Sequence, residues 1–250
     1  MYERNQLMGI SCAIDAVRDR VDAVARSHHP VLILGERGTG KNLCAAAIHD
    51  AGNRRGRPMV FIDCAALPGT LLESTLFGHE RGAFTGAVNR VTGRLEEADG
   101  TSLFLDEIGL LSLESQGRLL RFLEEGKIRR IGGKIDMKIE TRIIAATNRD
   151  LQRAAAEREF MMDLFDRLDV LRINMPPLRD RPEDIPILVE YFLSRLSGGQ
   201  RPILSDSALR KLAEYAFPGN VRELRSLCNR LETFFPGKTV ADQDIAQLLI

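Results

Sequence analysis

The fold is decided by residues 31–42, VLILGERGTGKN, in which an apolar run breaks into a glycine-rich turn that ends with a lysine. The apolar run is typical of a buried strand, and the helix-favouring AAAIH that follows predicts a helix. Glycines let the backbone curl so that successive N–H groups face one phosphate, and a helix N-terminus adds a partial positive charge. The order of strand, turn and helix therefore predicts a nucleotide-binding P-loop rather than an ordinary turn.

The predicted pocket carries its own charge and a possible metal ligand. Lys41 would place a positive charge on the outer phosphates of a nucleotide. The usual motif continues with a Ser or Thr hydroxyl that binds Mg²⁺, but this chain has Asn42, whose amide is a weaker metal ligand. The stretch predicts a bound nucleotide with Mg²⁺, and the nucleotide would be held by Gly35, Glu36, Arg37, Gly38, Thr39, Gly40, Lys41 and Asn42.

The composition is that of a globular protein. Its 250 residues are 44% hydrophobic, which suffices for one α/β core and a small appended unit. Lysine plus arginine and aspartate plus glutamate both number 35, so bulk charge gives no reason to expect direct binding of nucleic acid or an anionic membrane. No apolar run approaches the roughly 18 residues of a membrane span, and the polar start MYERNQ is not a signal peptide.

The cysteines form no C-x-x-C pair, so we expect buried thiols rather than metal ligands or disulfides. This usage suits a reducing cytosol and a cytoplasmic location. The cysteines are Cys12, Cys44, Cys64 and Cys228.

Two carboxylates end a later apolar segment. Residues 95–108, LEEADGTSLFLDEI, predict a strand that delivers Asp106 and Glu107 to a sheet edge. In a P-loop ATPase the aspartate can hold Mg²⁺ through water, and the glutamate can polarise the attacking water. A further apolar strand is predicted at 140–147, and Asn148 at its end could cap the helix predicted at 149–157.

Residues 80–89, ERGAFTGAVN, interrupt the pattern of strands and helices. This glycine-containing stretch has no apolar periodicity and one central aromatic residue, Phe84. The residues alone leave two interpretations open, a Phe84 exposed at the tip of a mobile loop or a Phe84 tucked back into the core.

The six residues GAFTGA within this stretch match, letter for letter, the loop by which bacterial enhancer-binding proteins engage sigma-54. These proteins are the AAA+ activators of sigma-54 RNA polymerase, and the chain resembles them over nearly its whole length through at least five ordered motifs. The resemblance implies that sigma-54 is contacted by Gly82, Ala83, Phe84, Thr85, Gly86 and Ala87.

The resemblance also assigns roles around the nucleotide. Asp106 and Glu107 resemble the family's Walker B carboxylates, although Thr101 and Ser102 replace the usual Gly-Thr before them. Asn148, in the triplet ATN, resembles the residue called sensor I, which implies a contact with the nucleotide.

The lid motif assigns a role to one arginine. Residues 217–224, FPGNVREL, resemble that motif with Phe217 in place of the commoner Trp, and Arg222 stands at the sensor II position. An arginine there can bind the γ-phosphate, or it can merely pair with Glu223 or Glu232.

Residues 158–174, REFMMDLFDRLDVLRIN, are similar to the segment that bears the family's arginine fingers. Arg167 falls on the second finger position, while the first is Met161, which cannot stabilise phosphate charge. The resemblance therefore implies one arginine donated to the neighbouring subunit where relatives donate two. The alternative is that Arg167 makes a surface salt bridge.

Asp63 ends the strand predicted at 59–63, where the family typically has an asparagine thought to hold the catalytic glutamate away from water. Two carboxylates within hydrogen-bond range, here Asp63 and Glu107, cannot both stay ionised cheaply, so either one takes a proton or the pair separates. Separation would release Glu107 toward the water. We therefore hypothesise that Asp63 makes hydrolysis less tightly coupled to sigma-54 contact. The alternative is that Asp63 bonds a nearby backbone N–H or an arginine and never meets Glu107.

Residues 175–186, MPPLRDRPEDIP, hold four prolines and predict a domain boundary. The predicted fold is an α/β AAA+ P-loop NTPase, with a parallel sheet of about five strands flanked by helices in residues 1–175 and a small all-helical lid in residues 176–250. The lid helices are predicted at 184–196, 205–216, 220–234 and 242–249.

The resemblance implies an ATPase that acts through Lys41, Asp106, Glu107 and the Arg167 of the next protomer in a ring, a hexamer by analogy. ATP hydrolysis would move the GAFTGA loop against sigma-54. The competing expectation is a regulatory ring subunit that hydrolyses ATP weakly or not at all, which Asn42, Asp63 and Met161 favour. Because no sensing domain precedes residue 7 and no helix-turn-helix follows residue 250, we expect either an excised central domain or a protein whose DNA-binding part was cut away, and in both cases DNA would be bound only through a domain absent from this chain.

Overall fold

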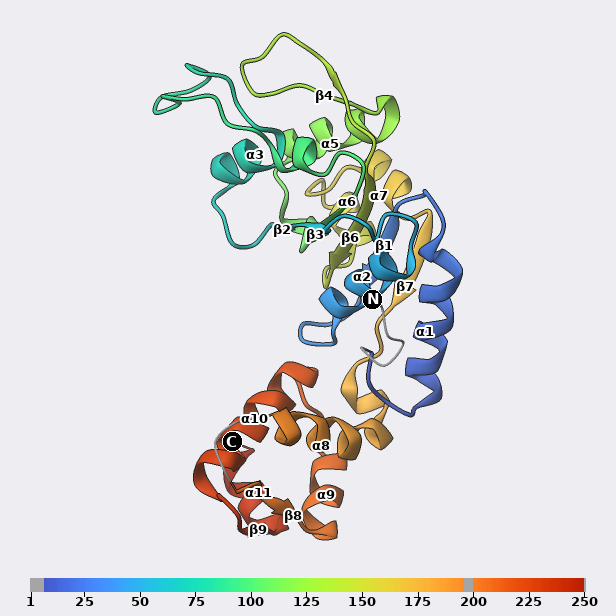
Figure 1. The fold of residues 1–250 in the computed structure, drawn as a ribbon, viewed down its shortest axis with the longest axis vertical. Coiled ribbons are helices and arrows are strands. Elements are labelled where there is room, and N and C mark those ends of the chain that lie inside the picture. Colours follow the sequence, from blue (N-terminus) through green and yellow to red (C-terminus); the bar gives the residue numbers. More distant parts are fainter. Residues whose placement is uncertain (1–6, 196–199, 250) are drawn as a thin grey trace. The chain divides into compact units, whose positions relative to one another are not determined.

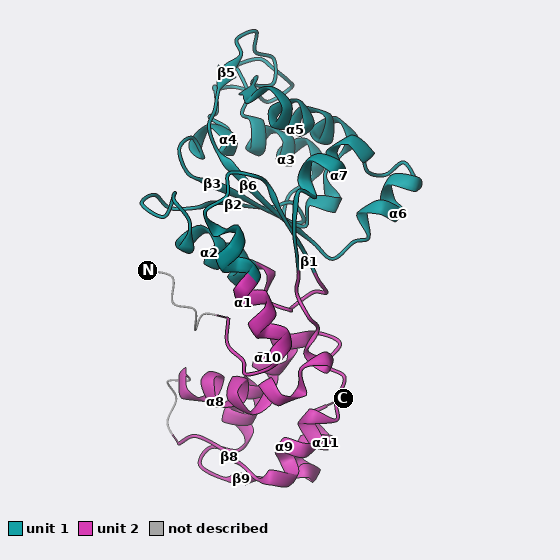
Figure 2. Ribbon diagram, turned by 90° about the vertical axis from the view of Figure 1, so that its right-hand side faces the viewer, with its two compact units in different colours: residues 1–3, 20–34, 42–173 teal, residues 4–19, 35–41, 174–250 magenta. Residues whose placement is uncertain are grey.

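The computed structural model describes residues 7–195 and 200–249. The chain forms two compact units, distinguished by colour in Figure 2. Within the described residues, unit 1 contains residues 20–34 and 42–173, and unit 2 contains residues 7–19, 35–41, 174–195 and 200–249. The P-loop and the N-terminal segment thus belong with the lid by their contacts, whereas the sequence-based boundary placed residues 1–175 together.

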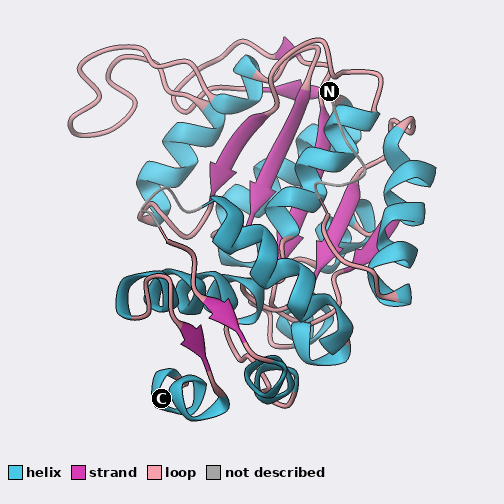
Figure 3. Ribbon diagram, turned by 60° about the horizontal axis from the view of Figure 1, so that its bottom comes forward, coloured by secondary structure: helices cyan, strands magenta, loops and turns pink. Residues whose placement is uncertain are grey.

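Unit 1 is built on a five-stranded sheet of order β2-β3-β6-β1-β7, flanked by helices (Figures 1 and 3). β1, β2, β3 and β6 pair in parallel, and side chains from both central strands, β3 and β6, are buried. This arrangement confirms the predicted fold class. The strands are β1 (Val31–Leu34), β2 (Val60–Asp63), β3 (Ser102–Asp106), β6 (Arg142–Thr147) and β7 (Leu171–Asn174).

Helices and a small hairpin accompany the sheet, among them α2, the helix that the sequence predicted after the P-loop, and α1, whose residues 12–19 belong to unit 2. Ser112 caps α5 by accepting the backbone N–H of Ser115, and Gly126 ends α5 with a φ of 65°. The helices are α1 (Cys12–Ala25), α2 (Lys41–Ala51), α3 (Gly69–Phe77), α4 (Arg94–Glu97), α5 (Leu113–Glu125), α6 (Leu151–Ala156) and α7 (Met162–Leu168), and the hairpin pairs β4 (Lys127–Ile128) with β5 (Met137–Lys138).

Two predicted elements differ from the structure. The strand predicted at 95–108 is limited to β3, because the LEE at its start forms the short helix α4 with Leu95 buried. The apolar Leu95 and Ala98 are three residues apart, which is a helical spacing, but a segment this short is ambiguous between a helical turn and a strand. The strand β7 was not predicted individually, because its LRIN is short and half-exposed.

The lid core in unit 2 is formed mainly by apolar residues of four helices, among them Leu212, Leu224 and Leu231, together with Phe217 from the segment between α9 and α10, and all of these are fully buried. These helices confirm the predicted lid, although residue 196 of the first prediction lies outside the described residues. The lid also contains one short parallel strand pair, which the all-helical prediction missed. Its elements are α8 (Ile185–Arg195), β8 (Ile203–Leu204), α9 (Asp206–Ala213), α10 (Asn220–Phe234), β9 (Thr239–Val240) and α11 (Asp242–Leu248).

Candidate functional site

The P-loop begins directly after β1 and is shaped by its glycines. Gly38 and Gly40 have φ angles of 79° and 105°, a region that side-chain-bearing residues rarely adopt. A Cβ on Gly38 would lie 2.2 Å from the carbonyl oxygen of Gly219 in the lid. Thr39 tightens the turn by donating its hydroxyl to the carbonyl of Glu36 at 2.8 Å. The curled backbone is the form that a phosphate-binding loop requires.

Lys41 lies at the first position of α2 with only 6% of its surface exposed. Its ammonium group donates to the carbonyl oxygens of Gly35 at 3.0 Å and Glu36 at 3.4 Å. A buried ammonium group held by the loop's own carbonyls, at a helix N-terminus, fits the binding of a polyphosphate. Asn42, the next residue, is exposed.

Glu36 faces lid residues. Its carboxylate accepts both guanidinium arms of Arg179, at 2.6 and 2.8 Å, and the amide of Asn220 at 3.1 Å. The hydrogen bonds from Arg179, followed by that from Asn220, lower the pKa of Glu36 to about 2. Glu36 was predicted as a nucleotide contact, and the structure places it in contact with the lid.

Buried polar residues that were not predicted as site residues surround the same loop. Asn220 is fully buried and also donates to the carbonyl of Arg37, while its side-chain oxygen accepts the N–H of Leu178. Arg181, only 2% exposed, donates to the carbonyl of Thr39 at 3.3 Å. The charge-rich RDRPED of residues 179–184 is a sequence signal for Arg181, but the prolines of this segment by themselves indicate only a domain boundary.

Asp184 ties the N-terminal segment to the lid. Its carboxylate, which is fully buried, accepts the backbone N–H groups of Ile10 and Ser11, at 2.6 and 2.8 Å, and the Ser11 hydroxyl at 2.8 Å. A Cβ on Gly9, whose φ is 148°, would lie 2.6 Å from this carboxylate. Arg181 pairs with the same carboxylate at 3.5 Å. A buried charge is tolerated here because it is paired and hydrogen-bonded.

The second set of predicted residues lies at the ends of the central strands of unit 1. Asp106 accepts the backbone N–H of Glu107 at 3.0 Å, and Glu107 accepts the N–H of Asn148 at 3.3 Å. Glu107 has a φ of 52°, an uncommon conformation for a residue with a side chain. The ends of β3 and β6 are therefore linked through the two carboxylates and Asn148.

Asp63 is opposite Asp106 in the register of β2 and β3. Its carboxylate accepts the backbone N–H of Ala65 at 2.8 Å, which is the neighbouring backbone contact named as the alternative to a switch. Asn148 does not cap the following helix, because the side chain of Asp150 caps α6 by accepting the N–H of Arg153. The capping interpretation of Asn148 was therefore wrong.

Two predicted arginines are exposed. Arg167, on α7, has 58% of its side chain exposed and lies 3.6 Å from Glu124, the salt bridge proposed as an alternative to the finger. Arg222 is on the first turn of α10, and a Cβ on Gly38 would lie 3.1 Å from its Cβ atom. Glu223, one of the two possible partners of Arg222, accepts hydrogen bonds from the Tyr215 hydroxyl and the backbone N–H of Gly219.

The GAFTGA loop is closed by a hydrogen bond from the N–H of Gly82 to the carbonyl of Ala87 at 2.8 Å. Phe84 is 46% exposed, and its ring packs edge-on against the His79 ring, with 4.9 Å between the two ring centroids. The expectation of an exposed Phe84 is confirmed, and the alternative of a core Phe84 is wrong. Ala87 is buried and anchors the end of the loop.

The base of this loop is fixed by the β4–β5 region. The N–H of Glu80 donates to the carbonyl of Ile131 at 3.0 Å. Arg130, only 7% exposed, pairs with Glu80 at 2.8 Å and with Glu96 at 2.5 Å. A mostly buried arginine with two carboxylate partners gives the exposed loop a fixed foundation.

Comparison with known proteins identifies the family. The sequence profile described as "Sigma-54 interaction domain" matches residues 7–174, and the one described as "AAA+ ATPase lid domain" matches residues 179–249. The chain belongs to the sigma-54 interaction domain family. This sigma-54 interaction domain is also similar to sigma-54-dependent activators over most of its length.

Two relatives and one solved structure illustrate the match. The Nif-specific regulatory protein of Azotobacter vinelandii is 50% identical over 228 residues, 90% of this chain and 44% of that protein. The transcriptional regulator NtrC of Azospirillum brasilense is 47% identical over 240 residues, 95% of this chain and 50% of that protein. NtrX from Brucella abortus, crystallised with ATP, has a TM-score of 0.88 and 33% identity, and the match covers 97% of this chain and 55% of that one. The sigma-54 interaction domain thus spans about half the length of these proteins.

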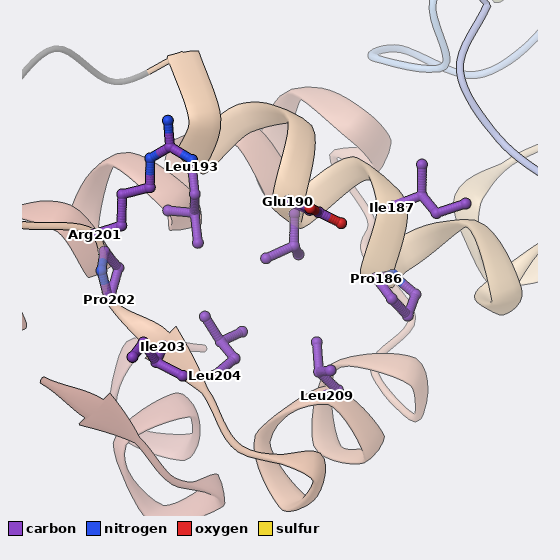
Figure 4. Close-up of a pocket in the computed structure, with 10 residues that line it drawn as sticks. Pro186, Ile187, Glu190, Leu193, Arg201, Pro202, Ile203, Leu204 and Leu209 are labelled. Carbon is purple, nitrogen blue, oxygen red and sulfur yellow. The ribbon is translucent and has the colours of Figure 1, made fainter. Parts of the chain in front are cut away.

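The lid of this sigma-54 interaction domain has a separate apolar pocket of about 470 Å³ (Figure 4). Leu193, Leu204 and Leu209 point toward it, and no predicted site residue lines it. The described residues contain no group of three or more His, Cys, Asp or Glu side chains able to hold a metal ion. No helix in residues 7–195 or 200–249 is long and apolar enough to span a membrane.

The cysteines differ in exposure. Cys44, Cys64 and Cys228 are buried free thiols, as predicted, and burial raises the pKa of each to about 12. Cys12 is exposed, contrary to the prediction, because it starts α1 on a side that its apolar stripe does not cover.

Proposed function

We propose that this sigma-54 interaction domain hydrolyses ATP and uses the reaction to remodel sigma-54 RNA polymerase through its GAFTGA loop. The observation that carries the proposal is the link between Glu107 and Asn148, at the ends of two adjacent parallel strands. Asp106 lies at the end of β3, next to Glu107. β6 pairs with β3 on one side and with β1 on the other, and β1 leads directly into the P-loop. We infer that the P-loop and these strand ends act on the same nucleotide, because β1 runs directly into the P-loop along the chain.

Each residue has a role in the proposed reaction. Lys41 and the P-loop N–H groups bind and orient the phosphates, and Glu107 orients and polarises the attacking water. Asp106 would hold Mg²⁺ through water, with Asn42 as a weaker ligand, and Mg²⁺ supplies charge neutralisation when bound. A magnesium site of this kind needs only one or two protein ligands because the phosphates provide the others.

Assembly completes the proposed site. The exposed Arg167 would reach the nucleotide of a neighbouring protomer, because its distant and exposed pairing with Glu124 is weak. Arg222 would bind the terminal phosphate from the lid. Hydrolysis in a homo-oligomeric ring, a hexamer by analogy with AAA+ activators, would move the exposed Phe84 against sigma-54. DNA would be bound through another part of the full protein, in the cytoplasm.

The test measures ATP turnover per protomer against protein concentration, with sedimentation in the presence of an ATP transition-state mimic. A trans-acting arginine predicts turnover that rises with concentration, together with a ring that forms when the mimic is added. Nucleotide binding and ring formation without turnover would instead support a non-hydrolysing regulatory subunit. That second candidate is favoured by Asn42, Asp63 and Met161, which replace residues that the family uses near the phosphates.

A further inference from the structure

The P-loop of this domain is attached to the lid through side chains. Residues 35–41 form part of unit 2, although β1 before them and most of α2 after them belong to unit 1 (Figure 2). The contacts responsible reach Glu36, Arg37 and Thr39, three of the seven residues in the loop. Their lid partners come from the residues between β7 and α8 and from the start of α10.

Glu36 makes the strongest of these contacts. One oxygen accepts Arg179 at 2.6 Å, and the other accepts Arg179 at 2.8 Å and Asn220 at 3.1 Å. A fork-to-fork pair of this kind fixes orientation as well as position. If the Glu36 carboxylate faced the phosphates of a nucleotide, it would repel them. The contact with Arg179, a lid residue, instead neutralises the negative charge of Glu36.

Asn220 supports the same arrangement from inside. It is fully buried, has a φ of 54°, and makes three hydrogen bonds, to Leu178, Glu36 and Arg37. Asparagine tolerates this left-handed conformation better than most residues, and its amide provides both the acceptor and the donors that these partners need. The start of α10 is therefore joined to the P-loop backbone by a residue that water does not reach.

We propose that Glu36 and Arg179 form a clamp that holds the P-loop in the frame of the lid, so that the phosphate-binding backbone moves as part of the lid. Glu36 is a positioning residue and not a nucleotide ligand. The inference rests on the proposed function in that the loop binds ATP. It deepens that proposal by making lid position and phosphate binding one event, while the water-activating Glu107 belongs to the other unit.

The clamp predicts a specific split in kinetic behaviour. Loss of the pair frees the loop and weakens nucleotide binding, because the loop must then be ordered when the nucleotide binds. Turnover at saturating ATP changes little, because the chemistry depends on Glu107. Arg179→Lys keeps the charge but loses the fork, so its effect is intermediate.

The experiment is a double-mutant cycle with Arg179→Ala, Glu36→Ala and the double variant. The dissociation constant of a fluorescent, slowly hydrolysed ATP analogue is measured together with kcat and KM. We expect each single variant to weaken binding about five-fold, the size of a good exposed ion pair, and the double variant to bind no more weakly than either single variant. Arg153→Ala is the matched control, because it removes an exposed Arg–Glu pair on α6 at 2.8 Å.

A second measurement reads the clamp without nucleotide. Amide hydrogen exchange in peptides that cover residues 35–41 should accelerate in Arg179→Ala and stay unchanged in Arg153→Ala. Unchanged exchange in Arg179→Ala, or additive losses of affinity in the double variant, would overturn the clamp. Failure of the parent protein to bind the analogue would overturn the proposed ATPase function alone, because the exchange result still decides whether the loop is clamped.

Discussion

Glu107 accepts a hydrogen bond from the backbone N–H of Asn148 at 3.3 Å, which joins the ends of the neighbouring strands β3 and β6. Glu107 does so from a left-handed backbone conformation with a φ of 52°. Such conformations cost of order 1–3 kcal/mol in general and occur where the surrounding structure holds a functional side chain in place. The bond gives the expected sensor residue a direct influence on the orientation of the expected catalytic carboxylate.

Glu107→Gln should therefore preserve ATP binding and nearly abolish hydrolysis. Glutamine keeps the size of the side chain and an oxygen that can accept from Asn148, but it cannot polarise water as a carboxylate does. The measurements are the affinity for an ATP analogue and the single-turnover rate of hydrolysis. Glu157→Gln, which makes the same chemical change at the C-terminal end of α6, serves as the control. Turnover within a few-fold of the parent would exclude Glu107 as the water-polarising residue.

Phe84→Ala should remove sigma-54 engagement while leaving stability nearly unchanged. Phe84 is 46% exposed, so its loss should cost far less than the roughly 3–5 kcal/mol typical of a buried phenylalanine. Phe61→Ala is a matched control, because Phe61 is also 46% exposed but lies on β2. The measurements are the melting temperature and binding to sigma-54 in the presence of a transition-state mimic. A melting temperature many degrees lower for Phe84→Ala, or equal loss of binding in both variants, would contradict a contact role for Phe84.

The local elements of this domain were predictable because each has a short-range cause. The apolar run before the P-loop, the capping by Ser112 and Gly126, and the periodicity of α10 all operate within a few residues. The polar network around Asp184 and Asn220 was not predictable, because it joins residues more than 170 positions apart in the chain. Sequence spacing carries no information about such pairs, and the same holds for Glu36, which the motif placed near phosphate and the structure pairs with Arg179.

The Glu36 carboxylate also predicts a pH dependence. Its pKa is lowered from 4.5 to about 2, chiefly by Arg179, so its ionised form is the one that stabilises the folded state. Since the folded-state pKa is the lower one, this stabilisation is fully present above about pH 4.5 and is lost as the pH falls from there toward about 2. The effect is small because the side chain is 41% exposed.

The check compares the urea midpoints of the parent and Glu36→Gln at several pH values. We expect a constant difference at neutral pH and a smaller difference below about pH 4.5. A difference that grows on acidification would contradict the predicted direction of the shift in the Glu36 pKa.

Asp63→Asn tests whether position 63 couples hydrolysis to sigma-54. The Asp63 carboxylate accepts the N–H of Ala65 at 2.8 Å, and an asparagine oxygen can make the same bond. The substitution therefore leaves the turn intact, removes a negative charge opposite Asp106 in the strand register, and adds an amide that can donate to Glu107. A donor to Glu107 would hold that carboxylate away from water until sigma-54 is engaged.

We accordingly expect Asp63→Asn to lower basal ATP turnover and to increase the ratio of turnover with sigma-54 to turnover without it. Asp63→Ala is the necessary companion, because it removes the same charge without adding a donor and should not restore the restraint. The two variants must first show the parent's melting temperature, since loss of the bond to Ala65 in Asp63→Ala could loosen the end of β2. An unchanged ratio in Asp63→Asn would mean that Asp63 serves only the turn, as its bond to Ala65 suggests when taken alone.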